Sequence, residues 1–463
     1  MSYGLDAAAF RDGFEGAVLT AGDAGYEEAR RIWNGVIDRR PAVIARCRGT
    51  ADVAAAVGFA RENDLTVAVR GGGHNVAGMA TVDGGLVVDL SALDAVRVDP
   101  ARRTVRVGGG AMLGGLDAAT QAHGLAVPVG VVSETGIGGL SLSGGIGWLR
   151  RKHGLTCDNL LAAEVVTADG EVLVADAGQH ADLLWALQGG GGNFGVVTSF
   201  EFACHPLGPE VAVAFVLYPG ERALEVLRKV DRYLAEAPDE VAPLAFFGRV
   251  PAAEPFPAEA HGTPYLAVLA PYAGDAEEGE RALRPLRELG TPIIDLSDRM
   301  PYADAQRLLD EDYPSGRRYY WKSIELAELS DDAIGQLMTS AGQMRSELST
   351  IDVWFQGGAM GRVAPEATAY GDRSAPILIG VEANWEDAAT DEENIAWARR
   401  CVDDLRPFSE GGVYLNFPGF MEEREEMLRG AFGANYDRLV EVKTRYDPAN
   451  VFRVNQNIPA ATA

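Results

Sequence analysis

The sequence is poor in the residues that build metal sites and disulfide frameworks. Its 463 residues include four cysteines and six histidines, scattered without a C-x-x-C pair or a metal-ligand spacing. We therefore expect neither a disulfide framework nor a bound metal ion.

Lysine is also scarce, and it occurs only at Lys152, Lys229, Lys322 and Lys443. The 41 lysines and arginines face 67 acidic residues, which gives a formal net charge of −26. Nucleic acids and anionic membrane surfaces repel such a chain, so neither is an expected partner. Few lysines among many carboxylates suit a salt-rich cytoplasm, and a GC-rich genome gives the same bias.

No apolar run is long enough to span a membrane. The segment from Met1 to Phe14 carries acidic residues and has no apolar centre, which argues against a secretory signal peptide. We expect a cytoplasmic protein that acts on a small molecule, and the sequence leaves both a monomer and a homodimer open.

Glycine, by contrast, is abundant, and many of the 55 glycines lie in clusters in the N-terminal part of the chain. The clusters are at residues 71–73, 108–110, 130–147 and 189–195. None of them has the context of the Rossmann fingerprint, which needs G-x-G-x-x-G between a strand and a helix. One large cofactor that crosses several backbone loops accounts for four clusters better than tight turns alone.

The first cluster is followed directly by His74. It lies between two apolar runs, Leu65–Val69 and Leu86–Leu90, that we expect to be strands. A histidine in this position is held against whatever the glycine loop wraps.

Local patterns predict further elements around the clusters. A helix is expected to begin at Thr50, and another from Leu113 to about His123. The dipeptide Asp169-Gly170 joins the apolar runs 161–167 and 171–174, which predicts a β-hairpin.

The character of the chain changes near residues 205–209. From about 210 to 405 glycine clusters become rare, and strands such as Val211–Leu217 alternate with amphipathic helices such as Arg222–Ala235. This pattern predicts a separate α+β domain, with an antiparallel sheet covered by helices. Loop character returns after residue 405.

Several motifs in combination carry a resemblance to a known family. They are Arg70-Gly71-Gly72-Gly73-His74, Gly138-Gly139, Ser143–Gly147, Lys152–Leu155, Asp158-Asn159, Gly191–Thr198 and Asp447–Asn457. On these residues the chain resembles the vanillyl-alcohol-oxidase superfamily, and within it the berberine-bridge-enzyme-like FAD-linked oxidases. The resemblance implies an α+β fold with a two-part FAD-binding domain at 1–205 and 410–463, and a substrate domain at 206–409.

The resemblance also implies that the flavin C8 methyl group is bonded to His74. Many relatives carry a second bond, from a cysteine to the flavin C6 carbon, but the aligned position here is Val132. Cys157 lies in a segment where relatives do not carry the linking cysteine, and we expect it to be a small buried hydrophobic residue. We therefore expect FAD bonded through His74 alone, as in relatives that oxidise nicotine-type amines.

We expect the cofactor to be bound by residues of the glycine clusters and of the C-terminal segment. These are Arg70, Gly71, Gly72, Gly73, His74, Asn75, Thr135, Gly138, Gly139, Gly144, Gly145, Asn193, Val197, Asn416 and Asn455.

The resemblance places an active-site tyrosine at Tyr414. A tyrosine is a poor base unless a neighbouring cation stabilises its phenolate, and Lys322 is a candidate for that role. Alternation in the run 377–385 puts Glu382 on one face with Gly380, so Glu382 is a second candidate base or partner.

Trp354 and Gln356 alternate on a neighbouring run. Aromatic side chains with a few polar groups suit a sugar or another polyol, and they suit an ordinary core face almost as well.

The resemblance, together with these features, implies an FAD-dependent oxidase. Hydride would pass from a hydroxyl-bearing carbon of a sugar, a secondary alcohol or a similar molecule to FAD, and then to O2, giving H2O2. The alternatives are an oxidase of a nicotine-like amine, a flavin dehydrogenase that does not use oxygen, and a flavin-binding protein without turnover.

Overall fold

The computed structural model describes residues 7–421 and 424–461. Residues 1–6, which begin the Met1–Phe14 segment expected to lack a signal peptide, lie outside the described residues. Within the described ranges, no helix combines the length and the apolar character that crossing a bilayer would need.

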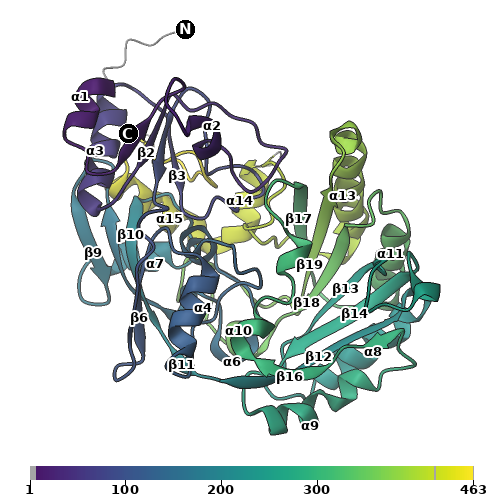
Figure 1. The fold of residues 1–463 in the computed structure, drawn as a ribbon. Coiled ribbons are helices and arrows are strands. Elements are labelled where there is room, and N and C mark those ends of the chain that lie inside the picture. Colours follow the sequence, from purple (N-terminus) through teal and green to yellow (C-terminus); the bar gives the residue numbers. More distant parts are fainter. Residues whose placement is uncertain (1–6, 422–423, 462–463) are drawn as a thin grey trace.

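Two halves of the molecule lie side by side in Figure 1, and one of them contains both ends of the described chain. In that half, helices α14 (Arg424–Phe432) and α15 (Tyr436–Tyr446) lie next to strands from the N-terminal part. The α+β class predicted from the sequence is confirmed.

The first sheet of this half has four strands in the order β1-β2-β4-β3. Its members are β1 (Ala17–Leu19), β2 (Val43–Arg46), β3 (Val67–Arg70) and β4 (Leu86–Asp89). Strands β2 and β3 both run parallel to β4, and helix α3 (Thr50–Glu62) buries its apolar face against them. The strands expected at 65–69 and 86–90 and the helix beginning at Thr50 are confirmed, with shifts at the ends.

The second sheet has five antiparallel strands in the order β5-β6-β10-β8-β9. Its members are β5 (Val96–Asp99), β6 (Thr104–Gly108), β8 (Leu160–Val166), β9 (Val172–Asp176) and β10 (Val196–Ala203). The Asp169-Gly170 hairpin is confirmed, because β8 and β9 pair on either side of it. Helices α4 (Leu113–Gln121), α7 (Ala181–Leu187) and α15 share its core.

The other half is built on an eight-stranded sheet with the order β15-β12-β14-β13-β18-β19-β17, where β16 also pairs with β12. Its members are β12 (Glu210–Pro219), β13 (Leu244–Arg249), β14 (Pro264–Pro271), β15 (Ile294–Asp295), β16 (Asp298–Pro301), β17 (Arg318–Leu326), β18 (Thr350–Phe355) and β19 (Ile377–Trp385). All of its pairings are antiparallel, as predicted.

Four helices cover the outer face of this sheet (Figure 1) and share one apolar core with it. They are α8 (Ala223–Leu234), α9 (Ala276–Arg287), α11 (Asp331–Gly342) and α13 (Asp391–Leu405). The opposite face packs against the other half through a second core. The domain boundaries at 205/206 and 409/410 remain a prediction.

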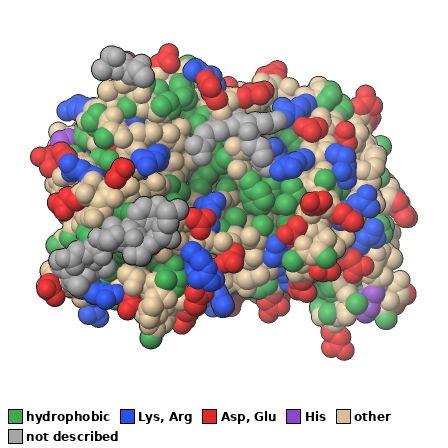
Figure 2. Space-filling model, turned by 90° about the horizontal axis from the view of Figure 1, so that it is seen from above, with side chains coloured by type: hydrophobic (Ala, Val, Ile, Leu, Met, Phe, Trp, Pro, Cys, Tyr) green, Lys and Arg blue, Asp and Glu red, His purple; other side chains and the backbone are tan. Residues whose placement is uncertain are grey.

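Several short helices complete the described chain. They are α1 (Ala7–Asp12), α2 (Tyr26–Ala29), α5 (Ile137–Leu142), α6 (Arg150–His153), α10 (Tyr302–Ala305) and α12 (Gly358–Gly361), together with the short strand pair β7 (Leu125–Ala126) and β11 (His205–Pro206). On the surface, Figure 2 shows acidic side chains spread over one face with basic ones between them, in keeping with the net charge of −26.

Candidate active site

A cavity lies between the two halves. On one side, glycine-rich loops of the first half line it, including residues 71–75 and 135–139. On the other side, its wall is formed by side chains of the eight-stranded sheet, among them Trp321, Asp352 and Glu382. The C-terminal part of the chain contributes Tyr414, Asn416, Phe417, Phe452, Val454, Asn455 and Gln456.

The glycine loops touch one another through their backbones. A Cβ atom on Gly72 would overlap the backbone of Gly136, and a Cβ atom on Gly136 would overlap that of Gly72. A Cβ atom on Gly109 would overlap the carbonyl oxygen of Val197. Glycine is therefore required where these clusters meet, and their convergence on one cavity agrees with a single large ligand.

The cavity wall carries no strong positive charge. None of the described residues that line it is a lysine or an arginine. The phosphates of a dinucleotide would therefore be held by backbone N–H groups of the glycine loops, which bind anions without a formal charge.

Gly139 tests this arrangement. An added Cβ there would meet no atom within 4 Å, and the residue lines the cavity, so a larger side chain would project into the space for the cofactor. We expect Gly139→Val to lose bound flavin while its thermal unfolding stays close to that of the wild type. Gly115, in helix α4, also has open space around an added Cβ but does not line the cavity, so Gly115→Val is the control. Full flavin content in Gly139→Val would contradict the assignment.

Most of the residues expected to bind the cofactor line this cavity. They are Gly71, Gly72, Gly73, His74, Asn75, Thr135, Gly138, Gly139, Val197, Asn416 and Asn455.

Four others do not line it, and they shape the loops instead. Arg70 is buried and pairs with the carboxylate of Asp89, behind the first glycine loop. Gly144 and Gly145 have φ angles of +110° and +88°, where only glycine is unstrained. The fourth is Asn193, which is part of a buried network described next.

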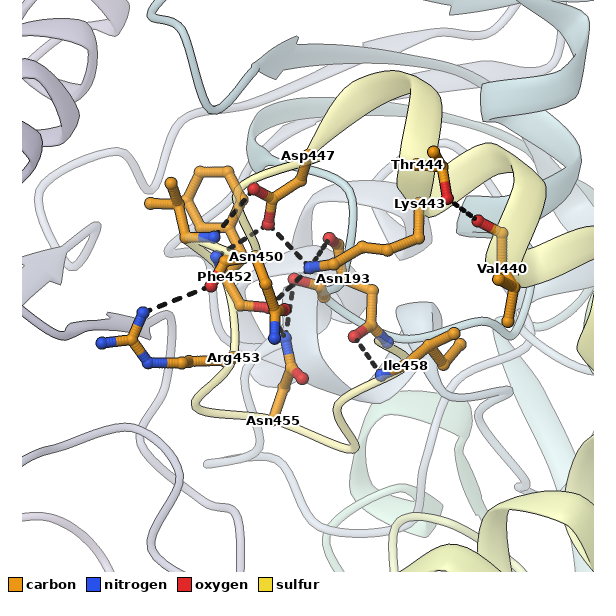
Figure 3. A network of polar contacts seen from close by, with 12 residues as sticks. Asn193, Val440, Lys443, Thr444, Asp447, Asn450, Phe452, Arg453, Asn455 and Ile458 are labelled. Carbon is orange, nitrogen blue, oxygen red and sulfur yellow. Dashed lines mark hydrogen bonds and ion pairs between the residues drawn. The ribbon is translucent and has the colours of Figure 1, made fainter. Parts of the chain in front are cut away.

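Asn193 ties the fourth glycine cluster to the C-terminal segment (Figure 3). Its amide donates to the carbonyl oxygens of Gly190 and Gln456 at 2.9 and 3.1 Å. Its side-chain oxygen accepts from the N–H of Ile458. Its own carbonyl oxygen accepts from Lys443. The network thus fixes two cavity walls that are far apart in sequence.

Lys443 is the centre of this network. Its ammonium group is fully buried, and it donates to the carboxylate of Asp447 at 2.6 Å and to the carbonyl oxygens of Asn193 and Phe452. Asp447 in turn accepts from the backbone N–H groups of Val451 and Phe452. The ion pair therefore orders the segment that carries the cavity residues 452–456.

His74 lies in the cavity wall at the end of the first glycine loop. Its Nε2 atom is buried and has no hydrogen-bond partner among the described residues. Burial lowers the pKa of the imidazole to about 3, so the ring is neutral at physiological pH. A neutral imidazole next to the glycine loop fits an aromatic cofactor to which it could form a covalent bond.

Tyr414 lies in the cavity wall beside the end of the third glycine cluster. Its hydroxyl oxygen accepts from the N–H of Ile146 at 3.1 Å and from the amide of Asn416 at 2.8 Å. Burial raises its pKa to about 12, although these two hydrogen bonds oppose the shift. Tyr414 is therefore a phenol at neutral pH, and its proton can be donated into the cavity.

Lys322 is not brought to this cavity. It alternates along β17 with Tyr319 and Trp321, which belong to the core facing the other half, and it lines a different pocket beside Pro418. Lys322 therefore does not share the cavity with Tyr414, where it was expected to stabilise a phenolate. The reason is that successive side chains of a strand point to opposite faces, so Lys322 points away from the face that carries Trp321.

Two buried carboxyl groups, Asp352 and Glu382, line the cavity on strands β18 and β19. In the register of these strands Asp352 pairs with Gly380, so Glu382 is its diagonal neighbour on the same face. Glu382 accepts a hydrogen bond of 2.7 Å from the hydroxyl of Tyr313. Burial raises the pKa of Asp352 to about 7 and that of Glu382 well above its ordinary value.

Asp352 was not among the residues singled out from the sequence. The sequence pattern that could have found it is the alternation that places Trp354 and Gln356 on one face of their strand. Asp352 lies two residues before Trp354, so it belongs to the same face. The side chains of Asp352 and Glu382 are 3% exposed or less. Each strand thus carries a buried acid among the hydrophobic residues of the core.

A cavity lined on one side by glycine-rich loops, and on the other by aromatic and carboxyl side chains of a sheet, suits a flavin-dependent oxidoreductase. Two family models agree with this class. Residues 41–176 match the FAD binding domain, and residues 413–459 match the family described as berberine and berberine like.

The chain belongs to the berberine-bridge-enzyme-like family of FAD-linked oxidases of the vanillyl-alcohol-oxidase type. It is 31% identical over 456 residues to an uncharacterized FAD-linked oxidoreductase of Bacillus subtilis, and the match spans 96% of this chain and 97% of the relative. It is therefore an FAD-linked enzyme that acts on a small molecule.

Two solved structures have the same fold. The 6-hydroxy-D-nicotine oxidase of Arthrobacter nicotinovorans has 30% sequence identity and a TM-score of 0.85, over 96% of this chain and 98% of its own. The glucooligosaccharide oxidase of Acremonium strictum has 24% identity and a TM-score of 0.86, over 98% of this chain and 98% of its own, and shares the fold.

Proposed function

We propose that the protein oxidises a small molecule at a hydroxyl-bearing carbon, as in a secondary alcohol or a sugar. The observation that carries this proposal is Asp352, a buried carboxyl in the cavity wall whose pKa is raised to about 7. Oxidation of an alcohol needs a base for the hydroxyl proton, and a base works best when its pKa lies near the working pH.

FAD would supply the acceptor for the hydride that leaves the substrate carbon. The glycine loops at 71–73 and 135–139 would hold its phosphates by their backbone N–H groups. Asp352 takes up the hydroxyl proton, and the phenol of Tyr414 donates a hydrogen bond to the substrate. Trp321 and Phe417 form aromatic walls that exclude water and orient the substrate.

A second candidate is the oxidation of an amine. The cavity contains two carboxyl groups that could accept hydrogen bonds from an ammonium group, and none of its described lining residues is a lysine or arginine that would repel one. The relative named as a 6-hydroxy-D-nicotine oxidase supports this candidate.

Anaerobic mixing of the purified protein with panels of alcohols, sugars and amines decides between the candidates. Loss of the oxidised-flavin absorbance with hydroxyl compounds alone supports the first, and loss with amines alone supports the second. If no compound bleaches the flavin, both are contradicted, and a flavin-binding role without turnover is favoured.

We also propose that O2 reoxidises the flavin and yields H2O2, as the oxidase names of the relatives suggest. A dehydrogenase that uses another acceptor is the alternative. Peroxide formed in proportion to substrate oxidised supports the oxidase, and slow reoxidation in air supports the dehydrogenase.

The covalent bond to FAD is proposed to involve His74 alone. Val132 lines the cavity where doubly linked relatives carry a cysteine, and Cys157 is fully buried in a core and is not among the lining residues. Burial also raises the pKa of the Cys157 thiol well above its ordinary value, which opposes a reactive thiolate.

Replacement of His74 by alanine is expected to leave FAD bound but releasable. Acid precipitation should retain yellow flavin on the wild-type polypeptide and release it from His74→Ala, because the bonding nitrogen is lost. His261, partly exposed and hydrogen-bonded to Phe256, supplies the control His261→Ala, which should keep its flavin. Flavin that stays with the washed His74→Ala polypeptide would exclude this histidine as the link.

A further inference from the structure

The imidazole of His74 lies at the end of a stack of three aromatic rings. It lies flat on the indole of Trp33, with ring centroids 3.9 Å apart and planes inclined by 21°. The other face of Trp33 stacks on Tyr319, at 3.7 Å and 10°. These rings come from three separate segments of the chain.

The stack on Trp33 is a contact that orients this imidazole. A functional histidine is usually held by a hydrogen bond to its second ring nitrogen. In His74 the Nε2 atom is buried and has no such partner among the described residues. The broad face of Trp33 is therefore a surface against which the plane of the ring is held.

Trp33 is itself rigidly held. It is 4% exposed, and its indole N–H donates to the carbonyl oxygen of Tyr313 at 2.9 Å. Its backbone N–H donates to the carbonyl oxygen of Gly73 at 3.3 Å, directly beside His74, and its carbonyl oxygen accepts from the N–H of Gly316 at 2.8 Å. Trp33 thus links the glycine loop to the start of strand β17.

Its neighbour Asn34 strengthens the same connection. The Asn34 amide donates to the carbonyl oxygens of Val76 and Tyr319, and its side-chain oxygen accepts from the N–H of Tyr319. The loop that carries His74 and the strand that carries Tyr319 are therefore clamped at a fixed distance, with the Trp33 ring between them.

We propose that Trp33 is a positioning residue for formation of the covalent bond between His74 and FAD: its ring holds the imidazole in the orientation from which the bond forms. This inference rests on the His74 link proposed above. In the balanced reaction, the imidazole loses its N–H proton and the flavin 8-methyl group loses one hydrogen as the C–N bond forms. The two electrons and two protons released are taken by O2, which becomes H2O2.

The test compares covalent attachment with flavin binding in the full-length protein as purified. Trp33→Leu removes the flat surface, and a ring free to turn should lose about 100-fold in the rate of bond formation. We expect this variant to bind FAD in a normal ratio but to release it on acid precipitation. Trp33→Phe keeps an aromatic face and is expected to restore the linked flavin.

Trp397→Leu is the matched control. Trp397 is 1% exposed and donates one indole hydrogen bond, of 3.0 Å, to the carbonyl oxygen of Ser340, but it lies in the core on the outer face of the eight-stranded sheet. A general loss of stability would affect both tryptophan variants, whereas bound but unlinked flavin should appear only in Trp33→Leu.

The outcomes separate this inference from the function on which it rests. If wild-type protein carries no linked flavin, the His74 link and the role of Trp33 both fail. If the wild type is linked, His74→Ala is not, and Trp33→Leu is as fully linked as the wild type, the role of Trp33 alone is overturned. Should Trp33→Leu not fold, Tyr319→Leu decides, because it removes the ring supporting Trp33: a reduced linked fraction supports the inference, and an unchanged fraction contradicts it.

Discussion

Asp352→Asn is expected to slow reduction of the flavin by substrate by a factor of about 10² to 10⁴, the usual contribution of a general base. Asparagine has nearly the same shape as aspartate and keeps the packing of strand β18, but it takes up no proton. The rate is measured by stopped-flow absorbance of the flavin under anaerobic conditions, at saturating substrate.

The pH dependence of the same rate gives a second readout. Asp352 is an active base only when ionised, and burial raises its pKa to about 7. The wild-type rate should therefore rise with pH up to about 7, level off above it, and fall about tenfold for each unit below. In Asp352→Asn this rise should disappear.

Asp298 provides a control for the change of charge. It is exposed on strand β16 of the same sheet, so Asp298→Asn should leave both the rate and its pH dependence unchanged. If Asp352→Asn keeps the wild-type rate and pH dependence, Asp352 is not the base, and Glu382 becomes the next candidate.

Lys443→Met is expected to lower the free energy of unfolding by about 3–5 kcal/mol, because it leaves the buried Asp447 carboxylate without its cation. The carbonyl oxygens of Asn193 and Phe452 also lose a donor. Since this network orders the C-terminal wall of the cavity, flavin should be lost at lower denaturant concentration as well. Urea unfolding, followed by tryptophan and flavin fluorescence, measures both effects.

The chain contains a matched ion pair at the surface. Lys229 pairs with Glu225 four residues away on helix α8, and both side chains are more than 40% exposed. Lys229→Met should therefore change the unfolding free energy far less than Lys443→Met. Equal effects of the two substitutions would mean that burial of the Lys443–Asp447 pair does not matter.

The sequence was informative about the fold wherever the signal was local. The strands beside the first glycine cluster, the Asp169-Gly170 hairpin and the antiparallel sheet under helices each depend on patterns within a few residues, and the structure has them. The convergence of the glycine clusters was also predictable. Four such clusters lie in the N-terminal part of the chain, and one large ligand that contacts several loops accounts for all of them.

The site was less predictable where it depends on pairing between distant segments. The stack of Trp33 on His74 joins residues that no periodic pattern connects, and the hydrogen bond from Trp33 to Tyr313 spans 280 residues of sequence. Lys322 is different, since its alternation with Trp321 along one strand already indicated that the two side chains point to opposite faces. Asn193 and Gly145 show that a glycine-rich motif also contains residues whose task is to hold the loop.

The cavity joins residues 67–75 to residues 452–456, and this has a consequence for how the protein is made. The loop with His74 leaves the ribosome hundreds of residues before the segment that closes the cavity over it. Domains generally fold in the order of their synthesis, yet this one must wait until residue 456 has emerged. We therefore expect FAD to enter after the whole site has been translated, and we expect a nascent chain stalled within the eight-stranded sheet to lack a complete site for it.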